Sequence, residues 1–384
     1  MEEERRNIRR YNLLKIDIEY YLLFVITLIL SIIGLIMVSS SSMAVGERYF
    51  NDPYWFIRRQ VIWWAISLIF LILASKINYH SYQKLSNFII IIVIGLLALV
   101  LIPGAGVEVG GSRRWLNLWF FNLQPSEFAK VAITFMLCDN IERKYRYGKR
   151  IKDIILPSFL ALCVITVLIF LEPDLGSVVI IWLIAFIVMF IGEVRFKHLI
   201  GLGSTGLIVI ISYLFMEDYR KARLFAFFNK AEEVEGANFQ ITQSLIALGS
   251  GNLTGVGLGN SMQKYSYLPE AHTDFIFAII GEELGLAGTL LVVTLFILFM
   301  FSGIRICIKT EDCFGRILAA GLTSIVIVPA IINIFVVVGL APVKGLALPF
   351  ISSGGSSLII NMIVAGILLN ISRNSSLSMI KSQK

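Results

Sequence analysis

The sequence predicts an all-α, polytopic integral membrane protein with about ten transmembrane helices, and three observations support this prediction. The 384-residue chain is 57% hydrophobic, and only 15% of its residues are charged, against about 25% in a soluble globular domain. Its mean hydropathy is +0.82. Ten stretches approach the roughly 20 apolar residues that a helix needs to cross the hydrocarbon core. They are residues 20–42, 56–75, 86–103, 125–141, 154–171, 176–192, 198–216, 274–302, 316–338 and 354–372.

These spans predict a single transmembrane domain over residues 1–384, with no separate soluble domain. We expect a cytoplasmic N-terminal segment at 1–19, a long extracytoplasmic loop at 217–273 and a cytoplasmic tail at 373–384. The first span follows a basic leader, but its apolar run is longer than the roughly 7–15 residues of a signal peptide. We therefore expect it to be a retained helix.

The net charge of +7 indicates membrane orientation rather than a nucleic-acid partner. An even number of spans places both termini on one side. If that side is the cytoplasm, the inside segments hold 21 of the 33 Lys and Arg residues. Because Lys and Arg in short loops set orientation, we expect cytoplasmic termini and no nucleic acid.

A polar motif stands at the start of the fourth predicted span, in GGSRRWLNLWFFNLQPSEFAK. Arg113 and Trp115 precede the helix, and Pro125 suits its first turn because the proline ring presets a helical φ. Glu127 and Lys130 are three residues apart and share one helix face. They form either a local ion pair or part of a substrate site.

The predicted outer loop is long and rich in apolar residues, whereas structureless loops beyond about 12–15 residues are uncommon. YRKARLFAFFNK (219–230) mixes cations with aromatics, which suits a helix in the headgroup layer. NFQITQSLIALG (238–249) is typical of a helix, with Gln240 and Gln243 on one face. The glycine-rich run 249–260 lacks the strand and helix that flank a phosphate loop. We therefore expect tight turns there and no nucleotide.

The eighth predicted span opens with PEAHTDFIFAIIGEELG. Asp274 lies at its outer mouth, where it either caps the helix, as Thr273 also can, or meets a substrate. Gly281 and Gly285 fall on the same stripe and allow another helix to approach closely. Asp174, in the turn EPDLGS, is interpreted as a helix cap.

Carboxylates and cations gather around an expected outward-facing cavity. Glu282 and Glu283 follow Asp274 by about 12–14 Å along the helix axis, which places them inside the membrane, and we interpret them as structural or cavity-lining residues. The last outer loop, GLAPVKGLALPFISSGGSS, carries Lys344 and then Ser356 at the start of the final helix. This combination suits a lipid-linked pyrophosphate, because cations hold phosphates and a carboxylate can move a proton.

Five motifs resemble those of the SEDS family in order and spacing, over about residues 12–372. PVKG, with Lys344, and PEAHTDFIFAIIGEELG resemble the FtsW and SpoVE branch, whereas RodA-like members tend to have Thr at the Lys344 position. Ser266 departs from that branch, in which this position is often acidic. The motifs are GGSRRWL, QPSEFAK, EPDLGS, QSLIALGSGNLTGVGLGNSMQKYSYLPEAHTDFIFAIIGEELG and GLAPVKGLALPFISSGGSS.

The resemblance implies a ten-helix peptidoglycan glycosyltransferase in the bacterial cytoplasmic membrane. Such a protein polymerises lipid II into a glycan strand at the outer face, with a class B penicillin-binding protein, in division, sporulation or elongation. Mg²⁺ or Mn²⁺ stays open as a cofactor, because no ligand set is readable. The predicted catalytic residue is Asp274, and the predicted substrate-binding residues are Arg113, Trp115, Glu127, Lys130, Gln243, Lys344 and Ser356.

For this activity we predict that Asp274 is the general base for the acceptor GlcNAc 4-hydroxyl. The oxygen attacks the anomeric carbon of the donor strand with inversion and releases undecaprenyl pyrophosphate, and the positioned base contributes about 10²–10⁴-fold. Arg113, Lys130 and Lys344 would bind the pyrophosphates. Three alternatives are a lipid II flippase, an elongation polymerase of the RodA type and a non-catalytic scaffold for a partner synthase.

Overall fold

The computed structural model describes residues 18–109, 112–117, 122–147, 152–216, 221, 237–265 and 267–382. Within these residues the chain forms eleven helices and three short strands. Nearly all of the predicted headgroup-layer helix at 219–230 lies outside the described residues, as does Ser266.

Each of the ten predicted spans coincides with a helix. Seven of these helices, α2, α3, α4, α8, α11, α12 and α13, are long and apolar enough to cross a membrane, and α6 and α7 contain shorter apolar stretches. The predicted helix at 238–249 is also present, as α10 (Ala237–Ser250). The long helices are α2 (Ile18–Phe50), α3 (Trp55–Lys76), α4 (Tyr79–Val100), α5 (Pro125–Tyr147), α6 (Lys152–Leu171), α7 (Leu175–Ile191), α8 (Phe196–Leu214), α11 (Ile276–Lys309), α12 (Cys313–Val337) and α13 (Gly355–Ser382).

The prediction of an all-α chain is corrected by a small antiparallel sheet between α4 and α5. Its strands follow the order β1 (Gly106–Val109), β2 (Ser112–Asn117) and β3 (Asn122–Leu123). Val107 lies opposite Trp115 in the ladder, and β-branched and aromatic side chains favour such pairs. The segment is too short for a hydropathy window to reveal, yet it positions the arginine side chains of β2.

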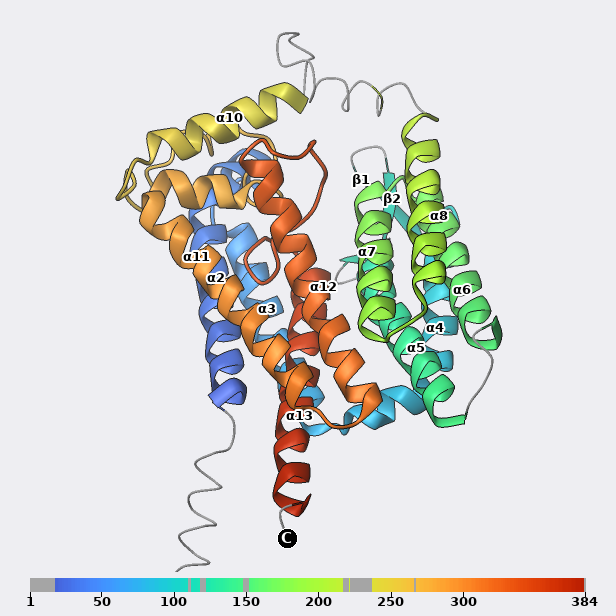
Figure 1. The fold of residues 1–384 in the computed structure, drawn as a ribbon. Helices are drawn as coiled ribbons and strands as arrows, with labels where there is room; N and C mark the ends of the chain where they lie inside the picture. The colour runs from blue at the N-terminus through green and yellow to red at the C-terminus, as the bar shows by residue number, and fades with distance from the viewer. Residues whose placement is uncertain are drawn as a thin grey trace, which may run out of the picture.

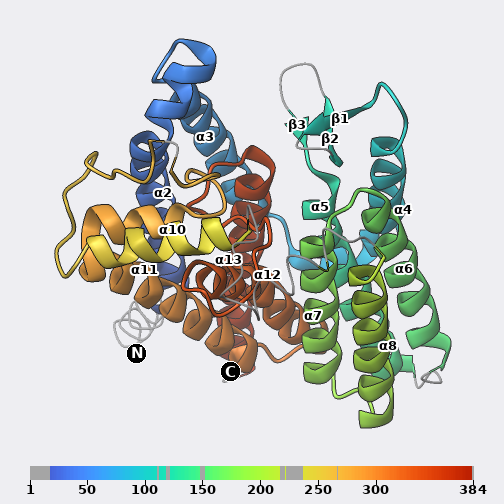
Figure 2. The same ribbon diagram turned by 90° about the horizontal axis from the view of Figure 1, so that it is seen from above.

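Two groups of helices are visible in the view from above (Figure 2). α2, α3, α10, α11 and α13 form one group, and α4 to α8 form the other. α12 joins them, since it packs against α11 and α13 on one side and against α5 and α7 on the other. The start of α2 and the end of α13 lie at one end of the molecule, whereas α10 and the sheet lie at the opposite end (Figure 1).

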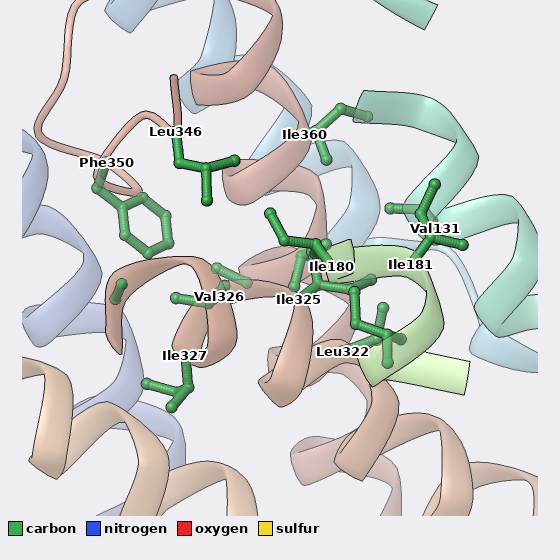
Figure 3. Close-up of a cluster of buried hydrophobic side chains, with 14 of the residues drawn as sticks. Val131, Ile180, Ile181, Leu322, Ile325, Val326, Ile327, Leu346, Phe350 and Ile360 are labelled. Carbon is green, nitrogen blue, oxygen red and sulfur yellow. The ribbon is translucent and has the colours of Figure 1, made fainter. Parts of the chain in front are cut away.

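An apolar cluster fills the junction between the two groups (Figure 3). Its side chains come from α5, α7, α12, α13 and the loop before α13, and they are buried. This packing sets the positions of the helix ends that line the functional cleft. The labelled members are Val131, Ile180, Ile181, Leu322, Ile325, Val326, Ile327, Leu346, Phe350 and Ile360.

α11 is broken at Gly285, which has φ 66° and ψ −162°. The first segment of the helix lies beside α10 and crosswise to the remainder (Figure 1). The predicted close approach is confirmed at Gly281, where an added Cβ would come within 2.4 Å of the Leu248 side chain of α10. At Gly285 the neighbour is a loop rather than a helix, because an added Cβ would lie 2.4 Å from the Gly255 nitrogen.

The segment that carries Glu282 and Glu283 lies crosswise under α10, which corrects the straight helix from which their depth was predicted. Both carboxylates hold the segment that directly follows the glycine-rich run. Ser261 and the Met262 nitrogen donate to Glu282. Lys264 Nζ lies 3.1 Å from Glu283 Oε1. Of the two interpretations, structural or cavity-lining, these contacts favour the structural one. The tight turns are confirmed, since Gly255 has a φ of 81°.

Candidate functional site

A cleft of about 210 Å³ lies between the two helix groups, below the sheet. Four of the predicted site residues line it: Trp115, Glu127, Lys130 and Asp274. Its wall also includes Ser353 of the loop before α13, Ser357 at the start of α13, and Ile325 and Pro329 of α12. A separate hollow of about 410 Å³ beside α2 contains none of the predicted site residues.

Asp274 lies in the turn directly before α11, and its side chain is half buried. The helix begins after Phe275, which is the N-cap and makes no side-chain cap bond. The hydroxyl of Thr273 donates to Glu270 Oε2 at 2.6 Å. The two capping alternatives are therefore wrong. Within the described residues the Asp274 carboxylate has no hydrogen-bond or ion-pair partner, and the residue lines the cleft.

The surroundings of Asp274 favour its protonated form. Burial and, second, the carboxylate of Glu270 raise its pKa to about 7, from an ordinary value of 3.8, although Arg114 acts in the opposite direction. A catalytic base works best when its pKa lies near the operating pH. Asp274 therefore has the pKa of a group that can accept and return a proton at neutral pH.

Glu127 and Lys130 form the ion pair that their spacing indicates, with Lys130 Nζ 2.6 Å from Glu127 Oε1. The side chains are 6% and 11% exposed, for Lys130 and Glu127 respectively. Pro125 begins α5, as predicted. The pair therefore places a buried cation in the wall of the cleft with its orientation held by a neighbouring acid.

The arginine that reaches the cleft is Arg114, which sequence reasoning had not selected. Arg113 lies opposite Glu108 in the β1–β2 ladder, is exposed and pairs with it at 3.3 Å. Arg114 lines the cleft and donates from Nε to the carbonyl oxygen of Glu172 at 3.2 Å. The register of β2 determines which of the two adjacent arginines reaches the cleft, and the hydropathy of the sequence does not reveal that register.

Three further predicted residues lie outside the cleft lining. Gln243 is half buried on α10. Ser356 is buried, accepts from the Gln124 nitrogen at 3.1 Å and so ties α13 to the start of α5. Lys344 is half buried directly before Gly345, which does line the cleft. Burial lowers the pKa of Lys344. Substrate roles for these residues stay predictions.

Two acids near the cleft were not selected from the sequence. Glu270 lines the cleft, four residues before Asp274, and has a left-handed φ of 57°. Glu172 is fully buried, and within the described residues neither carboxylate oxygen has a partner. Burial and then the charge of Asp174 raise the pKa of Glu172 to about 8. Asp174 itself caps α7 by accepting from the Ser177 nitrogen, as predicted.

Among the described residues no group of three His, Cys, Asp or Glu side chains could hold a metal ion. A role for Mg²⁺ or Mn²⁺ stays a prediction.

The fold and the cleft define a class: a multi-pass helical membrane protein with an unpaired carboxylate, an arginine and a paired lysine in one cleft. The model of the FtsW/RodA/SpoVE family of cell cycle proteins matches residues 20–377. The chain belongs to this family of bacterial membrane proteins, which confirms the resemblance drawn from the five motifs.

Two relatives match over nearly their whole length. Stage V sporulation protein E of Bacillus subtilis (strain 168) is 39% identical over 354 residues, which cover 92% of this chain and 97% of that protein. A Geobacter sulfurreducens (strain DL-1 / KN400) protein, named probable peptidoglycan glycosyltransferase FtsW, is 36% identical over 367 residues, which are 96% of each chain.

Solved structures share the fold. A chain from a peptidoglycan synthase complex that coordinates polymerization and crosslinking superposes with a TM-score of 0.70, at 24% identity, over 90% of this chain and 97% of that chain. The rod shape determining protein RodA of Thermus thermophilus gives a TM-score of 0.67, at 24% identity, over 92% and 96%. At this identity the likeness shows the fold alone.

Proposed function

We infer that this protein is a peptidoglycan glycosyltransferase that polymerises lipid II, with Asp274 as general base. The observation that carries the inference is the position of one unpaired carboxylate in a cleft shared with Arg114 and Lys130, in a chain of the FtsW/RodA/SpoVE family. Relatives named as FtsW and SpoVE, at 36–39% identity, support the same activity.

The chemistry follows from the residues of the cleft. Asp274 takes the proton from the acceptor sugar hydroxyl, and the oxygen forms a bond to the anomeric carbon of the donor. The bond from that carbon to the lipid pyrophosphate breaks, and the pyrophosphate leaves with the electron pair. Arg114 and Lys130 stand as fixed cations beside the charge that develops on the leaving group.

The membrane arrangement belongs to the same proposal. All ten long helices cross the cytoplasmic membrane, the termini face the cytoplasm, and the sheet, α10 and the cleft mouth face outward. The start of α2 and the end of α13 lie at the same end of the molecule, which supports this topology. A class B penicillin-binding protein is the proposed partner, in division or sporulation, and the synthase complex of like fold supports it.

The test uses purified protein with its class B partner, labelled lipid II and a divalent cation, for the native chain and for Asp274→Asn. We expect a ladder of glycan strands from the native chain and none from the variant, which should melt at a similar temperature. Equal ladders from both would remove Asp274 from the chemistry. Native protein that moves labelled lipid II across vesicles but makes no strands would favour a flippase.

A further inference from the structure

Asn333 of α12 connects the turn that carries Asp274 to the loop that faces it. Its side chain is 2% exposed. Nδ2 donates to the carbonyl oxygen of Asp274 at 2.7 Å and to the carbonyl oxygen of Leu346 at 2.6 Å. Both partners are carbonyl oxygens, which only accept, so only the amide nitrogen can face them. No apolar or acidic side chain of this size can replace this contact.

Further hydrogen bonds fasten the same two segments. Ser352 Oγ donates to the carbonyl oxygen of Thr273 at 2.5 Å and accepts from the Leu348 nitrogen at 2.8 Å. The Ser353 nitrogen donates to the carbonyl oxygen of His272 at 3.0 Å. Three consecutive residues of the Asp274 turn, 272–274, are therefore held by their carbonyl oxygens. We call this set of contacts from Asn333, Ser352 and Ser353 the clamp.

Each of the two segments that the clamp joins contains a residue with a strained backbone conformation. Glu270 has φ 57° on the turn side, and Phe350 has φ 64° on the loop side. A left-handed φ is a genuine outlier for a bulky residue such as Phe350, and such strain persists where the surroundings enforce it, often at functional sites. Gly34 of α2 supports the loop from below, because an added Cβ would lie 2.5 Å from the Phe350 carbonyl oxygen.

The clamp determines which groups surround the carboxylate of Asp274. A Cβ added at Gly345, on the clamped loop, would stand 3.1 Å from Asp274 Oδ2. The loop therefore lies against the carboxylate without offering it a side-chain donor. Of the surrounding charges, Glu270 belongs to the same turn, while the rest come from other elements. Those that act on Asp274 or line its cleft are Glu270, Arg114, Asp174, Glu127 and Lys130.

We propose that Asn333 is a positioning residue for the transfer reaction, which holds the Asp274 turn against the 345–353 loop so that the carboxylate faces the cleft unpaired and sheltered from water. It touches only backbone of the site and acts through Asp274. The inference rests on the proposed function for its kinetic consequence, whereas its structural part stands independently.

The experiment compares Asn333→Leu, which keeps the number and branching of the side-chain heavy atoms and removes the donor, with Asn370→Leu. Asn370 is a matched control: it is 5% exposed and also joins two backbone groups, accepting from the Tyr79 nitrogen and donating to the Ser75 carbonyl oxygen. It lies in the second half of α13, away from the cleft. Ser352→Ala removes a second bond of the clamp and serves if Asn333→Leu does not fold.

We expect Asn333→Leu, or Ser352→Ala, to lower the turnover rate at saturating lipid II by about 10- to 100-fold. The acid limb of the pH profile should move to lower pH, because a loosened turn hydrates Asp274. Asn370→Leu should lower the melting temperature and leave the pH profile of the folded fraction unchanged. A native rate and pH profile in both clamp variants would overturn the proposal.

Hydrogen exchange separates this inference from the proposed function. Amides of residues 270–275 and 346–353 should exchange faster in the clamp variants than in native protein or Asn370→Leu. That readout needs no activity, so it decides the clamp even if native protein makes no glycan strands. Unchanged exchange in these two segments would overturn the clamp itself.

Discussion

Lys130 Nζ donates to Glu127 Oε1 across 2.6 Å inside the cleft wall, and both side chains are nearly inaccessible to water. Removing one partner of a buried ion pair costs about 3–5 kcal/mol, because the other charge is left buried and unpaired. We therefore expect Lys130→Met to lower stability strongly. The double variant Glu127→Gln, Lys130→Met should regain most of that stability, measured by thermal melting, but no polymerase activity. Activity regained by the double variant would mean that Lys130 stabilises the fold and does not contact the phosphates of the substrate.

Arg113 and Arg114 are a natural matched pair. Arg114→Gln removes a fixed donor from the cleft, and losing such a donor costs roughly 10²–10³ in turnover. Arg113→Gln removes an exposed pair with Glu108, which is worth about 0–1 kcal/mol, and should leave strand synthesis within about twofold of native. Strand yield from labelled lipid II, measured for both, checks the assignment. The reverse order of effects would restore the original prediction of Arg113.

The pH dependence of the rate follows from Asp274. A general base must be deprotonated, and burial with the Glu270 charge raises the pKa of Asp274 to about 7. The rate at low substrate should therefore fall about tenfold for each pH unit below that value and level off above it. Replacing the neighbouring acid, in Glu270→Gln, should move the limb to lower pH. A limb near pH 4 in native protein would contradict this account.

The raised pKa of Glu172 predicts that the stability of the protein, rather than its rate, depends on pH. Its pKa is raised from an ordinary 4.5 to about 8 in the fold, so between these values the folded state keeps a proton that the unfolded state releases. Stability from this group is fully present below about pH 4.5 and is lost as pH rises towards 8. Glu172→Gln should flatten the fall in melting temperature between pH 5 and 8, whereas the exposed control Glu108→Gln should not.

Much of the fold was predictable because hydropathy acts locally. The ten apolar stretches, Pro125 at the start of α5 and the i, i+3 pair of Glu127 and Lys130 each depend on neighbours in sequence. Asp274 was found for the same reason, since a carboxylate beside an apolar run is conspicuous. The family resemblance then gave it a predicted role.

The features that escaped prediction depend on contacts between distant segments. Arg114 reaches the cleft because β2 pairs with β1 in one register. Asn333 looks like any polar residue of a membrane helix until its two carbonyl partners, fifty-nine and thirteen residues away in sequence, are brought together. From the sequence, Glu283 was interpreted as a carboxylate inside the membrane, because its partners could not be recognised. Ser40 is remote in sequence, and Lys264 lies in an irregular loop.

Gly285 is the position where this long-range dependence can be tested most directly. Its φ of 66° is costly for any residue with a Cβ, and an added Cβ would meet the Gly255 nitrogen at 2.4 Å. Gly285→Ala should therefore cost more than about 1 kcal/mol and should reduce activity, because the first segment of α11 continues from the Asp274 turn.

Gly95 of α4 is the matched control, since an added Cβ there meets nothing within 4 Å. Gly95→Ala should be neutral or stabilise by about 0.5–1 kcal/mol, because alanine is the better helix former. Melting temperature and strand yield for the two variants decide the matter. If Gly285→Ala behaved like Gly95→Ala, the break in α11 would not depend on the contact between Gly285 and the glycine-rich loop.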